Sequence, residues 1–540
     1  AEAFVKDLIA QGLGYAFPIV EPPHIKGVWA LRSAGLGLLA NIPGDQKAVA
    51  CIEDTAVAIE DLPDYIDEFA RTMEDFGQQA VYYAHAGAGE IHLRPILNLK
   101  QAEDVANFYR ISEASAKLVK KYNGSLSGEH GDGRVRAAFI PLMVGKENYA
   151  LFQRIKAVWD PYHIFNPGKI VDAAPMNTSL RYTPNQPTVE PQTVLDFSSA
   201  GGLLRMAEKC NGSGDCRKLP QSGGLMCPSY QATRNERDTT RGRANVLREF
   251  LTRGNAQDKP FVPSASASHT RTSDDPKRFD HSEIKEVMDL CISCKGCTSE
   301  CPSNVDMASM KAEFLYQYQR VHGIPLRTRL FAYINDLNQV GALFPSLTNF
   351  LLTHRSTSSW LKKWLQIAPA RTLPRLQSTS LRKWYKRQFS RPKTVAKLGK
   401  LYLFCDEFTN YNDPHIGIKT IELLTHLGYD VQLVEHPESG RAALSKGLLP
   451  RAQHYAQRNV DIFKNIVSDD TPLVGIEPSA ILSFRDEYPR LVAKPDIEAA
   501  RSLANHCFTI EEFLHRAFEQ GNIRSEHFTT ASRRLLVHGH

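Results

Sequence analysis

The sequence has no apolar run approaching the roughly 18 residues that a membrane-spanning helix requires. Its first residues, AEAFVKDLIAQGLGYAF, have neither the basic segment nor the apolar core of a signal peptide. No excess of one charge stands out, because 65 Lys and Arg nearly balance 59 Asp and Glu, and a net charge of +6 does not by itself indicate nucleic acid. The composition, 42% hydrophobic and 23% charged, is that of a soluble globular protein, and we expect a cytoplasmic location.

Cysteine is scarce over most of the chain, yet seven of the ten cysteines lie between residues 210 and 301. A secreted disulfide protein would be short and evenly cross-linked. Clusters with C-x-x-C spacing in a chain of 540 residues instead favour metal ligation in a reducing compartment. Cys51, Cys405 and Cys507 stand apart from these clusters, and we expect each to be a small buried apolar residue.

The length predicts about three domains, at roughly 100–200 residues each. The pattern along the chain predicts a multidomain α+β protein. We expect an α+β domain at residues 1–175, a linker at 176–200, a mostly helical domain with the cysteines at 201–345, a basic Trp-containing connector at 346–397 and a small α/β domain at 398–540. The polar stretch GNAQDKPFVPSASASHTRTSDDPKR within the helical domain predicts a loop.

Hydrophobic spacing predicts the individual elements. In LPDYIDEFARTMEDFG, one helical face carries Ile66, Phe69, Met73 and Phe76. QAVYYAH and EIHLRPIL predict two strands joined by the turn AGAG, and EDVANFYRISEASAKLVKKYNG predicts an amphipathic helix. Near the C-terminus, KLYLFCDEF, HIGIKTIELLTHLGY and DVQLVEH predict strand, helix and strand, and PLVGIEPSAIL predicts a further strand.

Residues 351–400 contain 13 Lys or Arg and neither Asp nor Glu, with Trp360, Trp364 and Trp384 interleaved. Such a segment can bind an anionic membrane surface or an acidic partner. A solvated basic face whose tryptophans pack inward would have the same composition. The sequence leaves both interpretations open.

CISCKGCTSECP is the most specific motif in the chain. In two-cluster ferredoxins, a C-x2-C-x2-C loop holds three corners of one 4Fe–4S cluster, and a fourth Cys before Pro ligates the other cluster. The motif consists of Cys291, Cys294, Cys297 and Cys301. By the same logic Cys227, which also precedes a proline, would complete the first cluster. Zinc is the alternative, although zinc usually takes two separated C-x-x-C pairs.

The stretch CNGSGDC has the outer spacing of the same motif, with Ser213 in place of the middle cysteine. A second cluster would take Cys210, Cys216 and Cys301. Three thiolates suit a 3Fe–4S cluster, or a 4Fe–4S cluster with serine, water or another group as the fourth ligand. Alternatively the second site is empty, and Cys210 and Cys216 are free thiols.

A different set of polar residues lies in HAGAGEIH and SGEHGDGR. His85 ends one predicted strand and His92 begins the next, where Arg94 shares its face. Glu129 and His130 are adjacent in a loop bounded by glycines. Two imidazoles and a carboxylate can hold a divalent metal with an open position, and a neighbouring histidine can act as a general base. On spacing alone, a hydrogen-bonded cluster without a metal is the alternative.

HAGAGEIHLRP, GSLSGEHGDGR and DPYHIFNPGKI occur in that order. Together they resemble the C-terminal, substrate-binding half of the FAD-linked oxidases of the vanillyl-alcohol oxidase superfamily, and among them the D-2-hydroxyacid dehydrogenases for D-lactate, glycolate and D-2-hydroxyglutarate. With the cysteine motifs and the tail included, nearly the whole chain resembles the C-terminal half of the bacterial D-2-hydroxyglutarate type, fused to a 4Fe–4S ferredoxin module. The resemblance implies that residues 1–175 form a ferredoxin-like α+β substrate and metal domain.

The resemblance also implies roles for single residues. His85, His92 and Glu129 match positions that bind a divalent metal, often zinc, and His130 matches the catalytic base. Arg32, in the W-x-x-R motif, matches the arginine that binds the substrate carboxylate. The residues that match the segment approaching the flavin are Asn166, Pro167, Gly168 and Lys169.

Arg94 stands where the related enzymes have Asn. A cation there suits the second carboxylate of a substrate such as D-2-hydroxyglutarate, and Lys47 is a further candidate for that task. The implied reaction is metal-assisted removal of the hydroxyl proton and hydride transfer to FAD, which yields a 2-oxo acid. The electrons then leave singly through the iron–sulfur clusters.

Nothing in the chain resembles the glycine-rich FAD-binding domain of these enzymes. We therefore expect the C-terminal half of a longer protein or of a split enzyme, inactive alone, with the FAD domain supplied in cis or in trans. The other expected partners are a small 2-hydroxy acid, a quinone or redox protein as electron acceptor, and further copies in an oligomer. A peripheral contact with the inner face of a membrane is also expected, and nucleic acid is not.

The tail resembles domains of heterodisulfide-reductase-like iron–sulfur subunits, but HPESGRAALSKGLL stands where their paired cysteines would be. We expect no cofactor there, and a structural or acceptor-docking role. A second interpretation of the whole chain follows from this part: a non-catalytic iron–sulfur electron-transfer subunit of a split D-lactate or glycolate oxidase complex. The residues that discriminate between the two interpretations are His85, His92, Glu129 and His130, because a relay needs neither a divalent metal nor a base.

Overall fold

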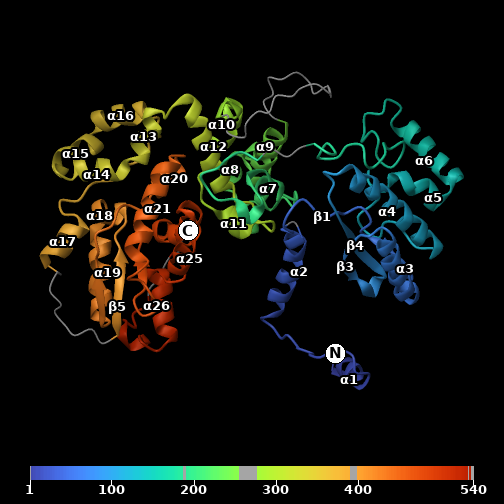
Figure 1. The fold of residues 1–540 in the computed structure, drawn as a ribbon, viewed down its shortest axis with the longest axis horizontal. Coiled ribbons are helices and arrows are strands. Elements are labelled where there is room, and N and C mark those ends of the chain that lie inside the picture. The colour runs from blue at the N-terminus through green and yellow to red at the C-terminus, as the bar shows by residue number, and fades with distance from the viewer. Residues whose placement is uncertain are drawn as a thin grey trace. The chain divides into compact units, whose positions relative to one another are not determined.

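The structure is a computed structural model that describes residues 2–39, 41–186, 190–253, 276–388, 398–532, 534 and 536 (Figure 1). Two compact units make up the chain. Unit 1 comprises Ala1–Val189, Glu208–Asp215 and Ser299–Val305, and unit 2 comprises Glu190–Ala207, Cys216–Thr298 and Asp306–His540. The compact units therefore exchange short segments around the cysteine motifs, and the five-part linear division stays a prediction.

Unit 1 is built around one antiparallel sheet whose central strand is β4. β1, β2 and β3 all pair with β4, and the long β3–β4 hairpin sets Tyr83 opposite His92 and His85 opposite Glu90. The elements of the unit are α1 (Glu2–Ala10), α2 (Ile25–Leu39), β1 (Lys47–Ala48), β2 (Thr55–Ala56), α3 (Leu62–Asp75), β3 (Ala80–His85), β4 (Glu90–Leu97), α4 (Ala102–Lys121), α5 (Ile140–Val144) and α6 (Lys146–Trp159).

Helices α3 and α4 pack against β4 and form the core of unit 1 with it. The predicted helix over LPDYIDEFARTMEDFG is confirmed, and Phe69 and Met73 are buried on its inner face. Tyr65 takes the deepest place, with its hydroxyl donating to Thr55 Oγ1 at 3.0 Å, while Ile66 and Phe76 are only partly buried. The predicted hairpin and the following helix are confirmed as β3, β4 and α4.

Unit 2 begins with helices around the cysteine motifs and ends in a parallel α/β tail (Figure 1). Helix α12 is the central helix of the first part, with ten buried residues. The helices before the tail are α7 (Leu203–Glu208), α8 (Pro228–Thr233), α9 (Thr240–Arg253), α10 (Ser282–Asp289), α11 (Gly296–Glu300), α12 (Met307–His322), α13 (Leu326–Ala332), α14 (Ile334–Gly341), α15 (Pro345–Thr353), α16 (Arg355–Trp364) and α17 (Leu381–Gln388), and α7 and α11 end on segments that count with unit 1.

The tail contains a parallel sheet in the order β6-β5-β7-β8. β8 is a strand that the sequence patterns did not predict. Helices cover both faces: α19 and α26 pack on one, and Phe404 of β5 meets Phe463 and Phe484 on the other. The tail elements are β5 (Gly399–Phe404), α18 (Glu407–Tyr411), α19 (Pro414–His426), β6 (Tyr429–Gln432), α20 (Arg441–Ser445), α21 (Leu449–Phe463), β7 (Leu473–Gly475), α22 (Pro478–Ile481), α23 (Ser483–Asp486), α24 (Tyr488–Leu491), α25 (Ile497–Ala504), β8 (Cys507–Thr509) and α26 (Ile510–Glu519).

Open parallel sheets bind ligands at the carboxyl ends of their strands, where the strand order reverses. In this tail the reversal lies between β5 and β7. Arg441 spans that place, with Nε 3.6 Å from Glu407, which follows β5, and Nη1 3.4 Å from Glu477, which follows β7. Side chains of the tail itself therefore occupy the usual ligand position.

Several segments differ from their sequence interpretation. Residues 190–200, assigned to a linker, pack into unit 2, where Leu195 and Phe197 are buried. Trp360 and Trp364 do not pack inward, because they are 68% and 51% exposed, whereas Trp384 packs against the core of the tail. Most of the predicted polar loop, residues 254–275, and residues 389–397 of the connector lie outside the described residues.

The three isolated cysteines, Cys51, Cys405 and Cys507, are buried as predicted. Among the residues that the structure describes, no helix combines the length and the apolarity needed to cross a bilayer.

The turn between β3 and β4 depends on Gly89, whose φ of 69° is unfavourable for other residues and whose added Cβ would lie 2.1 Å from the Val57 carbonyl oxygen. We predict that Gly89→Ala lowers the free energy of unfolding by at least about 2 kcal/mol, because backbone strain adds to a backbone clash. Gly87→Ala is the matched control in the same turn, since its Cβ would meet nothing within 4 Å. Urea unfolding of both variants checks this, and equal stabilities would contradict the role of Gly89.

Candidate active site

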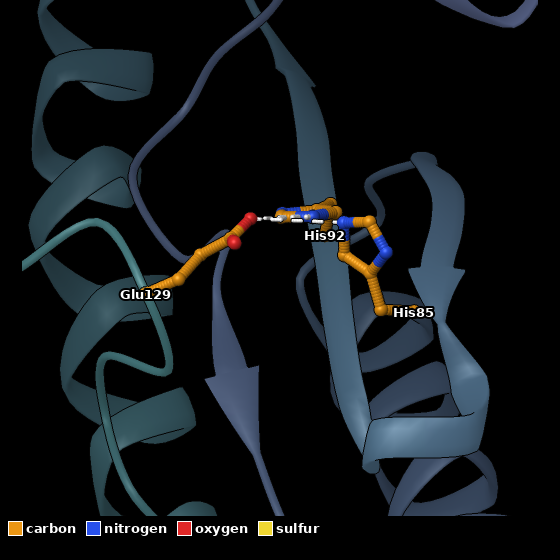
Figure 2. A group of neighbouring side chains, drawn as sticks. All are labelled: His85, His92 and Glu129. Atoms are coloured by element: carbon orange, nitrogen blue, oxygen red, sulfur yellow. Dashed lines mark ion pairs between the residues drawn. The ribbon is translucent and has the colours of Figure 1, made fainter.

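Three residues from two motifs that are separate in sequence meet at one end of the β3–β4 hairpin (Figure 2). His85 ends β3, His92 lies in β4, and Glu129 reaches them from the loop after α4. Glu129 Oε1 lies 3.6 Å from His85 Nε2 and 3.9 Å from His92 Nε2. The structure therefore brings together the three residues that the sequence predicts as metal ligands, with one ligand atom of each within 4.8 Å of the others.

His130 lies beside the same cluster, next to both His92 and Glu129. Its Nε2 is 3.4 Å from Glu129 Oε1, and its ring stacks on His92 at a centroid distance of 5.3 Å. Its Nδ1 lies 3.9 Å from both Glu53 and Asp54. One nitrogen thus points toward the metal-type cluster, and the other toward carboxylates that would stabilise a positively charged imidazole.

Asp54 holds the loop that carries Glu129 and His130. Its carboxylate accepts hydrogen bonds from the Ser127 hydroxyl at 2.6 Å and from the backbone N–H groups of Glu129 and His130 at 2.8 and 2.9 Å. The Gly128 N–H donates to the Asp54 carbonyl at 2.7 Å. A single fully buried residue thus fixes the loop across the sheet from His85 and His92.

Electrostatics differ sharply between the two buried acids of the site. Burial opposes ionisation of Asp54, but the hydrogen bonds from Ser127 and from the Glu129 and His130 backbones hold the pKa of its carboxyl well below the usual range. Burial, reinforced by neighbouring Asp54 and Glu129, raises the pKa of Glu90. Negative charge is therefore crowded here, and a cation would relieve it.

The donor set fits a divalent metal. Two imidazole nitrogens and a carboxylate oxygen form a borderline-hard set of the kind that zinc and similar ions accept. Glu90 Oε1 is buried, has no hydrogen-bond partner among the described residues, and lies 3.8 Å from His92 Nε2. A buried carboxylate oxygen without a donor costs free energy unless a cation balances it, which supports a metal at this point.

Two of the three histidines open onto a cavity of about 860 Å³. His92 and His130 line it, together with Arg32 of α2 and Arg94 of β4. The predicted carboxylate-binding arginine and the predicted base therefore share one cavity, whose size suits a small substrate and part of a cofactor.

Arg94 and Lys47 have surroundings that the sequence did not predict. Arg94 forms an ion pair with Glu53, a residue that also lines the cavity, so its charge is already balanced. Lys47 lies in a neighbouring cavity of about 430 Å³ and donates to the Ile42 carbonyl. Lys47 is therefore not grouped with the histidines, whereas Arg94 lines both cavities.

The segment Asn166, Pro167, Gly168 and Lys169 follows α6 on the surface and does not line the histidine cavity. The N–H of Ile170, the next residue, donates to the carbonyl of Gly133 at 3.4 Å, and Gly133 does line the cavity. The predicted flavin-facing segment is thus attached to the cavity wall without entering it.

Sequence reasoning missed Glu53, Asp54, Glu90 and Tyr83. Glu90 could have been predicted as a site residue, because it is spaced two residues from His92 and four from Arg94 along β4 and so lies on the same strand face. Tyr83 stacks on His92 at 4.8 Å, as strand pairing would have predicted once the hairpin register was known. No sequence pattern indicated a role for Asp54, because it lies in a short loop with a left-handed backbone conformation and follows no periodicity.

The first set of cysteines gathers in unit 2. The thiol of Cys294 lies within the electrostatic influence of Cys291 and Cys227, and that of Cys297 within the influence of Cys291 and Cys294. Burial raises the pKa of the Cys297 thiol to about 12, although the Met307 N–H hydrogen-bonds to it. Arg243 Nη1 is 3.7 Å from the Cys227 sulfur. Four converging thiols with N–H and cationic neighbours fit an iron–sulfur cluster.

The second set is divided. Cys210 and Cys301 belong to unit 1, and Cys216 belongs to unit 2. All three are buried, and Ser213 is exposed, with its N–H donating to Asn211 Oδ1 at 3.0 Å. A second cluster on these residues stays a prediction.

We predict that Asp54→Asn destabilises the chain by about 2–4 kcal/mol at neutral pH, because an amide cannot replace the carboxylate as acceptor of all three hydrogen bonds. Since folding lowers the pKa of Asp54, its contribution is present above the ordinary value of about 4 and is lost as pH falls below it. The difference in unfolding free energy between wild type and variant should therefore shrink between about pH 4 and pH 2. Urea titrations at several pH values test this, with the exposed Asp75→Asn as control. A difference that does not depend on pH would contradict it.

Comparison with known proteins supports two of the predicted domains. Residues 3–170 match the family model for the C-terminal domain of FAD linked oxidases, and residues 209–306 match the model for a 4Fe-4S dicluster domain. The first match contains the histidine site, and the second contains both cysteine motifs.

Known proteins are similar to different parts of the chain. A D-2-hydroxyglutarate dehydrogenase of Pantoea ananatis is 29% identical over 530 residues, with 93% of this chain and 50% of that protein covered. A D-lactate dehydrogenase of Archaeoglobus fulgidus is 28% identical over 128 residues, covering 24% of this chain and 28% of that protein. One subunit of the anaerobic glycerol-3-phosphate dehydrogenase of Escherichia coli is 24% identical over 198 residues, covering 36% of this chain and 48% of that protein.

The chain spans about half the length of the D-2-hydroxyglutarate dehydrogenases that it matches most extensively. It therefore joins a domain of the FAD linked oxidase C-terminal type to a 4Fe–4S dicluster domain, in a multidomain protein of mixed helix and sheet.

Proposed function

We propose that the chain forms the substrate-binding and electron-exit part of a flavin-dependent dehydrogenase that oxidises a D-2-hydroxy acid to the 2-oxo acid. The substrate that we propose is D-2-hydroxyglutarate. The observation that carries the proposal is the convergence of His85, His92 and Glu129 beside His130. His92 and His130 also line a cavity with Arg32. The similarity to named D-2-hydroxyglutarate dehydrogenases along most of the chain supports the choice of substrate.

The chain contains residues that would hold the divalent metal and the iron–sulfur cluster that this chemistry requires. His85, His92 and Glu129 would hold a divalent metal such as zinc, and Cys227, Cys291, Cys294 and Cys297 would hold a 4Fe–4S cluster. When bound, the metal supplies Lewis acidity at the substrate oxygen, FAD accepts the hydride, and the cluster accepts single electrons.

His130 takes the proton of the substrate hydroxyl in this proposal. Its Nε2 lies 3.4 Å from Glu129 Oε1, so the nitrogen that would receive the proton lies beside the residues that would hold the metal. Glu53 and Asp54, 3.9 Å from Nδ1, favour the protonated ring that results. Because the Asp54 carboxylate also fixes the His130 backbone, one residue both orients and stabilises the base.

Arg32 and Arg94 bind carboxylates in the proposal. Arg32 is an exposed cation at the cavity wall and suits the α-carboxylate of any 2-hydroxy acid. Arg94 suits a second carboxylate, which would compete with Glu53 for its guanidinium. We expect removal of Arg94 to lower turnover of dicarboxylates more than turnover of monocarboxylates, because only a dicarboxylate has a second carboxylate that can pair with this guanidinium.

An exposed apolar surface beside the Asn166–Lys169 segment suits the FAD domain, whether in cis or in trans. Trp159, Tyr162, Ile164 and Phe165 are each more than 60% exposed, an unusual density of large apolar side chains for a free surface. A partner domain that covered them would bring its flavin toward the wall of the histidine cavity.

The connector between the helices and the tail suits a peripheral membrane contact. Trp360 and Trp364 stack at 6.1 Å on the exposed side of α16, and Phe350 and Leu347 are exposed on the adjoining α15. The sequence of residues 351–400 has 13 Lys and Arg and no acid, a composition that complements anionic lipid.

A second candidate function is an electron-transfer subunit without its own substrate. It is favoured by the similarity to the anaerobic glycerol-3-phosphate dehydrogenase subunit, which extends over 36% of the chain. Under this alternative the histidine cluster would bind no divalent metal.

We predict that the protein, purified with its flavin-binding part, contains a divalent metal other than iron, and that His92→Ala loses it while iron is retained. His130→Ala should keep the metal and lower kcat for D-2-hydroxyglutarate by about 10²–10⁴, as expected for the loss of a general base. Metal analysis and turnover with a panel of D-2-hydroxy acids measure both effects, and His322→Ala, on α12 of unit 2, is the control. Iron without a second metal, together with full turnover of His130→Ala, would sink the proposal.

For the membrane contact, we predict that replacing Trp360 and Trp364 by Ala lowers the fraction bound to phosphatidylglycerol vesicles by about tenfold or more, since both side chains lose apolar burial. Binding of the wild type should also weaken as salt is raised. Vesicle sedimentation measures it, and Trp159→Ala, an exposed tryptophan of unit 1, should bind as the wild type does. Equal binding of the double variant would rule the surface out.

A further inference from the structure

Unit 2 contains a cavity of about 700 Å³ that the proposed chemistry does not use. Its walls come from α12, from the region of α13 and α14, and from α21. Three tyrosines and a histidine line it, with apolar and guanidinium groups between them: Tyr316, Ile324, Tyr333, Arg451, His454 and Tyr455. Aromatic walls with hydrogen-bond donors at their edges suit a flat, neutral ring that carries carbonyl oxygens.

Arg451 organises the polar side of this cavity. Its guanidinium lies 3.8 Å above the Tyr333 ring and 4.9 Å from the Tyr455 ring centroid. It forms ion pairs with Asp336 and, at 3.2 Å, with Glu438. The cation thus lies against two aromatic rings, and acids balance its charge before any ligand arrives, which favours a neutral ligand over an anion.

Behind this wall lies a buried acid. Glu438 is 5% exposed, and burial raises its pKa to about 7. Burial and the neighbouring Glu438 charge raise the pKa of the Tyr455 hydroxyl. A buried carboxyl whose pKa is raised toward neutrality, beside a hydroxyl that lines the cavity, can pass protons to a bound molecule.

The cavity is connected to the first cysteine set by α12. The Met307 N–H at the start of the helix hydrogen-bonds to the Cys297 thiol, and Lys311 Nζ donates to the Cys291 carbonyl. Tyr316 lines the cavity nine residues after Met307, which at 1.5 Å per residue is about 14 Å along the helix. One rigid, largely buried helix therefore joins the thiols to the cavity wall.

From these observations we infer that the cavity between α12, the α13–α14 region and α21 is the binding site of a quinone, which takes the electrons that leave through the iron–sulfur cluster. The inference rests on the proposed function for the source of the electrons. The assignment of the binding site itself does not depend on that function. It assigns the acceptor, which the sequence left open between a quinone and a redox protein, to a site within this chain.

The overall redox reaction balances with a quinone as oxidant. Oxidation of the hydroxy acid breaks its O–H and α-C–H bonds and releases two electrons and two protons. The quinone takes up two electrons, one at a time, and two protons at its carbonyl oxygens to become a quinol. The Glu438–Tyr455 pair delivers protons from the side of the cavity and is reprotonated from water.

Direct binding tests the site without any turnover. We expect decylubiquinone to bind the purified chain, as measured by titration calorimetry, and an azido-quinone to label peptides of α12 and α21 on illumination. His454→Ala and Tyr455→Phe should each raise the Kd about tenfold, because each removes a polar group from the cavity edge. Tyr318→Phe is the control, since Tyr318 lies on α12 but stacks on Phe314 and His322 instead of lining the cavity.

Absence of binding to the wild type, labelling confined to other peptides, or unchanged affinity in both cavity variants would overturn the inference. Failure of the proposed function would look different, since quinone binding would persist while no D-2-hydroxy acid was oxidised. In the complete enzyme, Tyr455→Phe should slow reduction of decylubiquinone and leave reduction of the flavin by substrate unchanged.

Discussion

The hydrogen bonds from the Glu129 and His130 backbones to the buried Asp54 carboxylate are the interaction on which the site depends. A loop of glycine and polar residues has little apolar surface of its own to fix it. Asp54 supplies the missing constraint, and Ser127 adds a third donor to the same carboxylate. The loop is thereby held where Glu129 meets the histidines of the β3–β4 hairpin, and the hairpin in turn depends on the tight turn at Gly89.

This arrangement concentrates acidic groups around the imidazoles. Glu53, Asp54, Glu90 and Glu129 all lie within 4 Å of a histidine nitrogen. Arg94 and Arg136 pair with Glu53 and Asp54, but the Glu90 side retains a buried oxygen without a donor among the described residues. Arginines thus balance the acidic side chains next to His130. Within the described part of the chain, the acidic side chain next to His92, Glu90, has no such partner, and a metal ion would balance its charge.

The elements around the site were predictable from sequence because they follow periodic patterns, whereas the choice of His85, His92 and Glu129 as metal ligands came from the resemblance to FAD-linked oxidases. Alternation along EIHLRPIL correctly put His92 and Arg94 on one strand face, and the apolar spacing located α3 and α4. The pairing of Arg94 with Glu53 was not predictable, since it joins a strand to a loop about 40 residues away. The exposure of Trp360 and Trp364 could not be predicted either, because composition does not distinguish a helix face that packs inward from one that faces solvent.

X-ray absorption at the zinc edge of the zinc-loaded chain tests the central claim most directly. If His85, His92 and Glu129 hold the ion, the spectrum will show nitrogen and oxygen scatterers at about 2.0–2.2 Å with the multiple scattering of two imidazoles, and no sulfur. His92→Ala should remove one imidazole contribution or the metal altogether. Sulfur scatterers at about 2.3 Å, which would mean that the cysteines bind the zinc, or a spectrum of hydrated ion alone, would contradict the account.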